Sequence, residues 1–386
     1  MSYPQVFGEE QDMRIGLNLL YMIPGEVGGT ETYAAGLLDG LARVGGNHEY
    51  FVFVNRESAD FPLPRVPGFT RLVCPIWSAD RKKRYLFEQG KLPRLLSTHH
   101  VDVVHSLGYV GPLFAPVPSV VTVHDLNYRT LGMYMPVVRR TMLALFVSQS
   151  IRRANRVITV SQFSKREIMQ AFRLPSERIV VTHEAPGPVS TEAHALPHTR
   201  AILAQLGIND PYIVAFGSHG PNKNIGRLMQ AFLGLKARNC LPHQLVLVGH
   251  LPARDTLPRF SEGEIRMTGY LDSDILQMVL SSAQLLVFPS FYEGFGLPPL
   301  EAMACGVPVA CSDRGPMPEV AGEAAVFFDP FSVEDMGEKI RQLATDPSLS
   351  SDLVQKGYRN LQRFSWEKTA RQTLEVYSDA IAGAAR

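Results

Sequence analysis

Two glutamates flank a loop with alternating glycines in the segment Glu293-Gly-Phe-Gly-Leu-Pro-Pro-Leu-Glu301. The segment follows the apolar run 285–288, so we expect the loop at the carboxyl end of a strand, where open α/β sheets bind ligands. Gly294 and Gly296 let the backbone approach a ligand closely. The prolines that follow suit the start of a short helix whose first N–H groups face the loop. The pattern predicts an anion site, with Glu301 in the first helical turn beside it.

A simpler interpretation is that Glu301 only stabilises the helix dipole and that the glycines only form a turn. The pairing of Glu301 with Glu293 across a double-glycine loop favours ligand binding over this alternative.

Short, continuous runs rich in Val and Ile recur along the chain, and such runs suit parallel strands that are buried on both faces. Helical patterns lie between several of them, as at 31–44 and 163–172; the second opens with Ser164 and Glu167 at capping-box spacing. We therefore predict an α/β protein with two Rossmann-like, doubly wound domains facing a central cleft. The predicted strands are 14–20, 50–54, 102–106, 119–123, 156–160, 178–182, 212–216, 244–249, 264–269, 285–290, 307–311 and 325–329.

A stretch rich in proline and small polar residues, 184–199, interrupts this alternation. We predict an N-terminal domain over 1–185, a linker over 186–199 and a C-terminal domain over 200–365. The last helical stretch, from about Trp366 to Ala384, has no strand after it, so we expect residues 366–386 to pack back on the N-terminal domain.

The composition excludes several classes of protein. Lys plus Arg number 38 and Asp plus Glu 37 in 386 residues, a balance that argues against a dedicated nucleic-acid binder. The four cysteines form no Cys-x-x-Cys pair, which argues against a disulfide framework or a zinc site. No apolar run is long enough to span a membrane, and the polar, acidic start is not that of a signal peptide. We expect a soluble, cytoplasmic protein.

The glutamate segment extends into the longer pattern E-G-F-G-L-x-x-L-E-A-M-A-x-G-x-P-V, which resembles the E-x7-E signature of retaining GT-B glycosyltransferases of family 4. The resemblance covers nearly the whole chain. Its other segments are Gly28–Thr30, Thr122–Leu126, Val160–Ser164, Gly217–Asn224, Gly269–Leu271 and Pro318–Gly322.

The resemblance implies roles for matching residues of the second half. Glu293 would contact the hydroxyls of the donor sugar, Glu301 would bind the ribose, and Lys223 would neutralise the diphosphate. Family members often have an arginine where this chain has Ser218 or His219, so one positive charge is missing. The other implied donor-binding residues, which would present backbone N–H groups or cradle the base, are Gly294, Phe295, Gly296, Leu297, Tyr270 and Leu271.

In the first half, the resemblance implies that His124 hydrogen-bonds the donor sugar and that the Gly28–Gly29 loop lies against the phosphates. We expect His124, Lys223 and Glu293 to be the catalytic residues. Lys223 would stabilise the charge that develops on the leaving diphosphate, while Glu293 and His124 orient the sugar. By the same analogy we expect front-face transfer with retention.

The resemblance also suggests the reaction partners. The Gly-Ser-x-x-Pro-Asn-Lys-Asn pattern resembles mannosyl- or rhamnosyltransferases of cell-surface polysaccharides, so we expect GDP-mannose as the donor and a saccharide or lipid-linked saccharide as the acceptor. UDP-sugar-dependent glucosyl or N-acetylglucosaminyl transfer is one alternative. Another is a nucleotide-sugar-binding partner subunit without activity, and a nucleotide-sugar hydrolase or 2-epimerase is a third.

We expect no cofactor and no essential metal. The Asp272-Ser-Asp274 segment resembles a metal-binding Asp-x-Asp, but it directly precedes a helical stretch, where capping by Asp272 or Ser273 is the better interpretation.

Clusters of basic residues lie beside aromatic ones in the first half. They fit either an anionic membrane or lipid-diphosphate acceptor, or simply solvated helix faces. These clusters are Arg81–Arg84, Arg139–Arg140 and Arg152–Arg153.

Overall fold

The computed structural model describes residues 12–130, 132, 137–187, 198–218, 220–251 and 256–384, apart from the side chains of 138 and 139. The chain divides into two compact units, one comprising residues up to Glu184 together with those from Trp366 onward, the other Ala185–Ser365. Most of the predicted linker, residues 188–197, lies outside the described residues.

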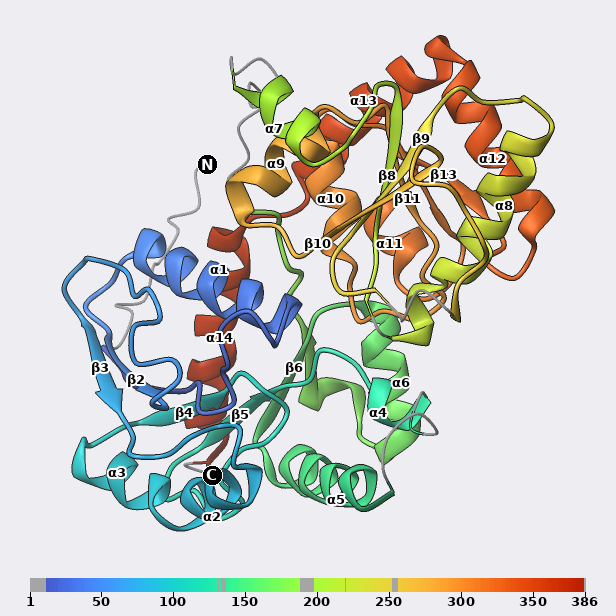
Figure 1. Cartoon of the computed structure of the whole chain (residues 1–386). Coiled ribbons are helices and arrows are strands. Elements are labelled where there is room, and N and C mark those ends of the chain that lie inside the picture. Colours follow the sequence, from blue (N-terminus) through green and yellow to red (C-terminus); the bar gives the residue numbers. More distant parts are fainter. Residues whose placement is uncertain are drawn as a thin grey trace, which may run out of the picture. The chain divides into compact units, whose positions relative to one another are not determined.

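The first unit is built on a seven-stranded parallel sheet of order β3-β2-β1-β4-β5-β6-β7 (Figure 1). Its strands are β1 Arg14–Asn18, β2 Glu49–Val54, β3 Phe69–Val73, β4 Val103–Ser106, β5 Ser119–Thr122, β6 Arg156–Thr159 and β7 Ile179–Val181. Its helices are α1 Gly29–Val44, α2 Arg81–Gly90, α3 Leu92–Thr98, α4 Asn127–Thr130, α5 Val137–Arg153, α6 Gln162–Phe172, the 3₁₀ turn η2 Ser176–Arg178 and α14 Trp366–Ala384.

The second unit has a six-stranded parallel sheet of order β10-β9-β8-β11-β12-β13. Its strands are β8 Tyr212–Phe216, β9 Gln244–Val248, β10 Ile265–Gly269, β11 Leu285–Phe288, β12 Val309–Ser312 and β13 Ala325–Phe328. Its helices are α7 Thr199–Gln205, the 3₁₀ turn η4 Pro221–Lys223, α8 Ile225–Ala237, α9 Ser273–Ser281, α10 Leu297–Ala304, α11 Met317–Ala321, α12 Val333–Thr345 and α13 Pro347–Leu361.

The prediction of two doubly wound, Rossmann-like domains is confirmed, and each predicted strand is present. The strand β3 was not predicted. It lies at the sheet edge, most of its residues are exposed, and Thr70 and Arg71 interrupt its apolar character. An edge strand needs no continuous apolar run, so a search for such runs does not detect it.

The predicted capping box at Ser164 is wrong. Helix α6 begins at Gln162, and the side chain of Ser161 accepts a hydrogen bond from the backbone N–H of Ser164. Ser164 is therefore already inside the helix. Its hydroxyl donates instead to the backbone carbonyl of His124, which ties α6 to the end of β5.

The last helix, α14, belongs to the first unit, as predicted, and Figure 1 shows it beside α1. The two helices approach closely because α1 has glycines on the facing side. A Cβ built on Gly36 would lie 2.1 Å from the ring of Trp366, and one on Gly40 would lie 2.3 Å from the carbonyl oxygen of Trp366. Arg43 on α1 also pairs with Glu367 at 3.0 Å.

Replacing Gly40 with alanine tests this close packing. Alanine in a helix interior normally stabilises by up to about 1 kcal/mol relative to glycine. Here the added methyl group meets backbone, so we expect Gly40→Ala to destabilise by about 1–3 kcal/mol in urea denaturation. The matched control is Gly234→Ala in α8, where no atom lies within 4 Å of the added Cβ, and it should stabilise. A stabilising Gly40→Ala would contradict the α1–α14 contact.

Candidate active site

The candidate residues of the second unit follow neighbouring strands. β8 and β11 are adjacent at the middle of the sheet, where the strand order reverses. Lys223 ends the η4 turn after β8, and Glu293 lies in the loop after β11. At such a reversal the following connections lead away in opposite directions, which leaves room for a ligand at the carboxyl ends of the strands.

Lys223 and Glu293 form an ion pair, with 2.8 Å between Nζ and Oε1. Their side chains are only 22% and 16% exposed, so solvent screens the pair less than a surface pair. Nζ also lies 5.4 Å from the centre of the Phe288 ring. An ammonium has three donors and this bond uses one. The two loops therefore bring a cation and a carboxylate to one point.

Two asparagines hold these loops together. The Asn222 amide donates to the carbonyl of Tyr292 at 3.0 Å, and the backbone N–H of Phe291 donates to the carbonyl of Asn222 at 3.0 Å. Asn224 adopts a left-handed conformation with φ 57° and donates to the carbonyl of Pro289 at 3.2 Å. Sequence reasoning had quoted the asparagines as part of a motif but gave them no role, because bonds to distant backbone carbonyls leave no sequence pattern.

The glycine loop ends at Gly296, which is the N-cap of α10 and has φ 98°. A Cβ on Gly296 would lie 2.2 Å from the terminal methyl of Met317, which could shift, so it is the backbone conformation that requires glycine. Leu297 is the first helical residue and is buried. Pro298 and Pro299 follow it and lack N–H groups. The N-terminus of α10 therefore offers fewer donors than the sequence analysis expected.

Glu301 is the fifth residue of α10, so it lies in the second turn rather than the first. The sequence analysis started the helix at a proline, whereas the helix begins at Leu297. The two glutamates of the E-x7-E pattern thus belong to different elements, Glu293 to a loop and Glu301 to a helix.

The remaining predicted residues of this unit are distributed around these two loops. Gly294 and Phe295 are buried, and the Phe295 ring packs edge-on against Phe364. Ser218 follows β8, and its hydroxyl accepts a bond from the N–H of Gly220 at 3.1 Å. His219 lies outside the described residues.

Tyr270 and Leu271 follow β10, and the two side chains differ in exposure. Leu271 is buried, whereas Tyr270 is 59% exposed and stacks on His250, with ring centres 6.0 Å apart and planes 15° apart. His250 comes just after β9, at the same edge of the sheet. Sequence reasoning missed it, although its place directly after a predicted strand was available as a signal. The pair forms a flat aromatic surface of the kind on which a base can stack.

Asp272 occupies the N-cap position of α9, as predicted, but its side chain makes no capping hydrogen bond. Among the described residues, no group of three or more His, Cys, Asp or Glu side chains could hold a metal ion. The expectation of metal-independent activity remains a prediction.

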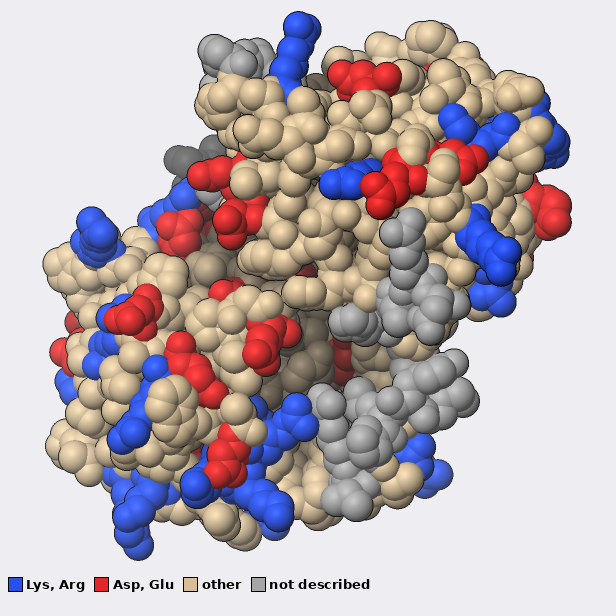
Figure 2. All heavy atoms as spheres, in the orientation of Figure 1, with Lys and Arg blue, Asp and Glu red and all other residues tan. Residues whose placement is uncertain are grey.

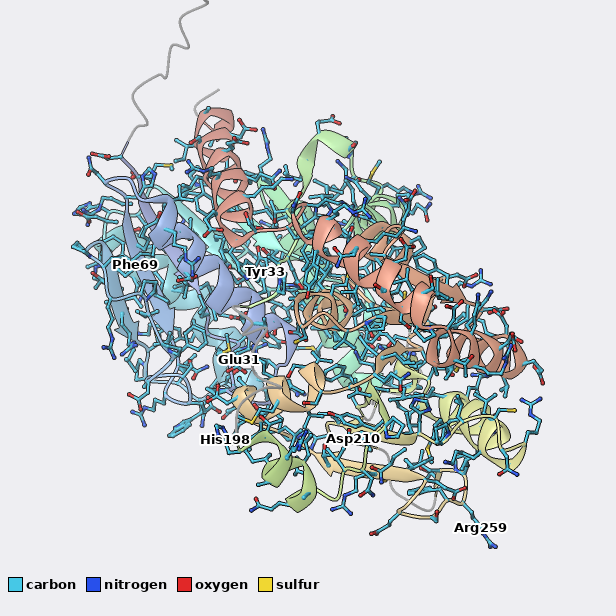
Figure 3. All side chains as sticks on the ribbon, turned by 90° about the horizontal axis from the view of Figure 1, so that it is seen from above. Glu31, Tyr33, Phe69, His198, Asp210 and Arg259 are labelled. Atoms are coloured by element: carbon cyan, nitrogen blue, oxygen red, sulfur yellow. The ribbon has the colours of Figure 1, made fainter. Side chains whose placement is uncertain are left out.

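In the first unit, His124 lies where three strand ends meet. It follows β5 and is 5% exposed. Its Nε2 is 3.1 Å from the carbonyl oxygen of Leu107, after β4, and its Nδ1 is 3.3 Å from Oε1 of Glu184, after β7. Tyr33 of α1, labelled in Figure 3, packs edge-on with the His124 ring at 4.7 Å.

Counting hydrogen-bond donors fixes much of the protonation of this pair. A carbonyl only accepts, so Nε2 of His124 carries a proton. A hydrogen bond between Nδ1 and the Glu184 carboxyl group needs one further proton, on either partner. As arranged here, both ring nitrogens have protein partners, so a bond from His124 to a sugar requires one of these bonds to break. Sequence reasoning missed Glu184, which it had noted only as the first residue of the proline-rich stretch 184–199.

Gly28 and Gly29 begin α1, after β1. Gly28 is the N-cap with φ 55°, and Gly29 is the first helical residue. β1 and β4 are the strands at which this sheet reverses its order. The side chain of Asn18, at the end of β1, donates to the hydroxyl of Ser106 at the end of β4, at 3.2 Å. The glycine turn thus occupies in the first unit the place that Lys223 has in the second.

A second buried histidine, His105, lies next to this region. His105 of β4 contacts the Tyr377 hydroxyl of α14 through Nδ1 and the Thr122 hydroxyl of β5 through Nε2, both at 2.7 Å. Burial lowers the pKa of His105 to about 3, so the ring is neutral near neutral pH. Tyr33 also reaches the Thr122 hydroxyl, at 3.3 Å. The histidine therefore joins α14 to the sheet next to His124.

Comparisons with known proteins agree with this arrangement. Residues 27–185 match the family model described as Glycosyltransferase Family 4, and residues 199–360 match the one described as Glycosyl transferases group 1. The O-antigen chain mannosyltransferase B of Escherichia coli is 35% identical over 269 residues, which cover 67% of this chain and 70% of that protein. The chain is a family 4 glycosyltransferase.

Other relatives extend this assignment. The MMP alpha-(1->4)-mannosyltransferase of Mycolicibacterium hassiacum is 30% identical over 302 residues, 73% of this glycosyltransferase and 71% of that protein. The structure of sucrose-phosphate synthase from Thermosynechococcus elongatus matches with a TM-score of 0.72 at 19% identity, over 96% of this chain and 100% of that one. The fold is therefore GT-B, as predicted.

Substitutions at Glu184 test its bond to His124 in this glycosyltransferase. Glu184→Ala leaves a buried ring nitrogen without a partner and should destabilise by about 1–3 kcal/mol in urea denaturation. Glu184→Gln should lose much less stability than Glu184→Ala, because the amide N–H of the glutamine can donate to Nδ1 of His124. The control is Glu177→Ala at an exposed position of the same unit, with a change of about 0.5 kcal/mol or less. Equal losses in Glu184→Gln and Glu184→Ala would contradict the hydrogen bond.

Proposed function

We propose that this glycosyltransferase transfers mannose from GDP-mannose, with retention of configuration, to a saccharide or lipid-linked saccharide during synthesis of a cell-surface polysaccharide. The observation that carries the proposal is the ion pair between Lys223 and Glu293, the first glutamate of the E-x7-E pattern, where the sheet order reverses. The choice of mannose rests on the names of the relatives, an O-antigen chain mannosyltransferase and an MMP alpha-(1->4)-mannosyltransferase.

In the proposed reaction, the bond between the anomeric carbon and the diphosphate oxygen breaks while the acceptor hydroxyl attacks from the same face. The diphosphate oxygen receives the acceptor's proton, so no protein nucleophile is needed. Lys223 and the backbone N–H groups of the Gly294–Leu297 loop would stabilise the charge on the leaving group. Glu293 would accept hydrogen bonds from the sugar hydroxyls, and Glu301 from the ribose.

Lys223 can serve this reaction because it lies in the turn after β8, where the donor would bind. Its ion pair with Glu293 balances the charge of the ammonium in this partly buried position. The missing arginine at Ser218 or His219 would make diphosphate binding depend more on this single cation. We also propose that His124 and the Gly28–Gly29 turn contribute to donor binding from the first unit, and that the enzyme works without a metal or other cofactor.

We place the reaction in the cytoplasm, at a membrane that would carry a lipid-linked acceptor. The free state of Cys74, Cys240, Cys305 and Cys311 fits a reducing compartment. A UDP-sugar donor and an inactive nucleotide-sugar-binding subunit are the alternatives that the experiments below must separate.

The two glutamates should affect different steps. Glu293→Ala should abolish transfer and leave the affinity for the nucleotide nearly unchanged, because Glu293 would contact the sugar of the donor and not GDP itself. Glu301→Ala should weaken nucleotide binding first, by about tenfold for one lost charge-assisted hydrogen bond. Calorimetric titration with GDP and a transfer assay separate the two effects. Wild-type turnover excludes the inactive-subunit alternative, and unchanged turnover in Glu293→Ala would overturn the assigned role.

A thermal-shift panel with GDP, UDP, ADP and dTDP and their sugars tests the donor, because a ligand that binds only the folded state raises the melting temperature. We expect GDP and GDP-mannose to give the largest shifts, unchanged by EDTA. A larger shift with UDP-sugars would mean that the donor is a UDP-sugar instead of GDP-mannose. Loss of the shift in EDTA would contradict the metal-free site. The stereochemistry is tested separately, since an inverted anomeric product in proton NMR would refute retention.

A further inference from the structure

One face of the first unit carries both exposed apolar side chains and cations. Contacts connect the elements that form this face. Tyr85 of α2 stacks on Phe146 of α5, with ring centres 4.5 Å apart. Gln89 of α2 bonds the backbone of Gly111 at 3.1 Å, and the backbone N–H of Leu113 donates to Gln89 at 2.8 Å. We call the surface formed by α2, residues 111–114 and α5 the α2–α5 face.

Large apolar side chains project from this face. Leu86 is 74% exposed, Phe114 72% and Leu145 52%, and these residues come from three different elements. Each is a side chain that folding would normally bury, and each is more than half exposed. Exposed apolar side chains gathered on one face mark an interaction site.

The charge on the α2–α5 face is mostly positive, although Asp80, the N-cap of α2, pairs with Lys83 at 3.0 Å and the side chain of Arg84 is only 12% exposed. The sequence of α2 has four cations and one glutamate, and that of α5 has four arginines and no acidic residue, in a chain whose net charge is only +1. The single glutamate, Glu88, is buried, and burial raises its pKa to about 7, so its negative charge is partly removed near neutral pH. Figure 2 shows Lys and Arg side chains gathered at the lower edge of this unit, where Figure 1 places α2.

The cations lie next to the apolar side chains. Lys82 and Lys83 are exposed one turn before Leu86 on α2. The guanidinium of Arg153 lies 4.4 Å from the centre of the Phe114 ring. Leu145 and Arg152 of α5 also border a hollow of about 460 Å³ whose wall includes Arg129 of α4. Apolar side chains surrounded by cations suit a surface that is itself apolar beneath an anionic layer.

We propose that the α2–α5 face binds the surface of a membrane that contains anionic lipids. Lys82, Lys83 and the arginines would attract the head groups, and Leu86, Phe114 and Leu145 would enter the acyl boundary. An acidic protein or a nucleic acid would also attract the cations, but neither explains the three exposed apolar side chains. Among the described residues no helix is long and apolar enough to cross a membrane, so this binding would be peripheral. The inference does not depend on the donor or on the transfer reaction.

Flotation of the full-length protein with vesicles tests this proposal. We expect binding to vesicles of phosphatidylcholine with 30% phosphatidylglycerol, little binding to phosphatidylcholine alone, and loss of binding in high salt. Lys82→Gln/Lys83→Gln should weaken binding by about 10–30-fold, at about 1 kcal/mol per cation. Leu86→Ser should weaken it several-fold without changing its salt dependence.

The controls remove the same charge and apolar surface elsewhere. Arg238→Gln/Arg359→Gln removes two exposed cations from the second unit, and Val66→Ser removes a side chain that is 44% exposed in the first; both should bind like wild type. Each variant must keep the melting temperature of the wild type, which shows that it is folded.

Three results would overturn the proposal. The first is absence of binding to the anionic vesicles. The second is equal weakening in the Lys82/Lys83 and Arg238/Arg359 variants, which would indicate a response to net charge alone. The third is that Leu86→Ser binds both heparin and the anionic vesicles as well as the wild type does. Apolar insertion would then play no part in binding, which would indicate an acidic partner instead of a lipid surface.

Discussion

The site depends on one topological constraint, the reversal of strand order in each parallel sheet. Where β8 adjoins β11, and β1 adjoins β4, the two following connections run to opposite sides, and the carboxyl ends of neighbouring strands remain uncovered by a shared helix. Residues 70 positions apart, Lys223 and Glu293, can therefore come within 2.8 Å of each other. The asparagines of the η4 turn then fix this approach by binding backbone carbonyls of the β11 loop.

The first unit depends in addition on its last helix. α14 covers α1 and the sheet only because Gly36 and Gly40 leave space for Trp366, and its Tyr377 supplies a hydroxyl to the buried His105. His105, in β4, and His124, after β5, differ in their partners. His105 bonds only hydroxyls, whereas Nδ1 of His124 lies 3.3 Å from a carboxylate oxygen of Glu184.

Several errors of sequence reasoning share a physical cause. The capping box was assigned to Ser164 instead of Ser161, and Glu301 to the first turn instead of the second, because the start of a helix depends on where the preceding chain stops being held by the sheet. The edge strand β3 was missed because exposed strands lack the apolar pattern of buried ones. Glu184 and His250 were missed because their partners are distant in the sequence.

The sequence by itself determined the alternation of strands and helices, the two doubly wound sheets, the position of the last helix and the glutamate segment that indicates the family. These features follow from local apolar runs, turn residues and fixed spacing, which act over a few residues. Only the tertiary structure decided which side chains meet: Lys223 with Glu293, His124 with Glu184, Tyr270 with His250, and the exposed apolar residues of α2 and α5 with their cations. Such pairings arise from strand order and helix packing, which join residues that no local pattern relates.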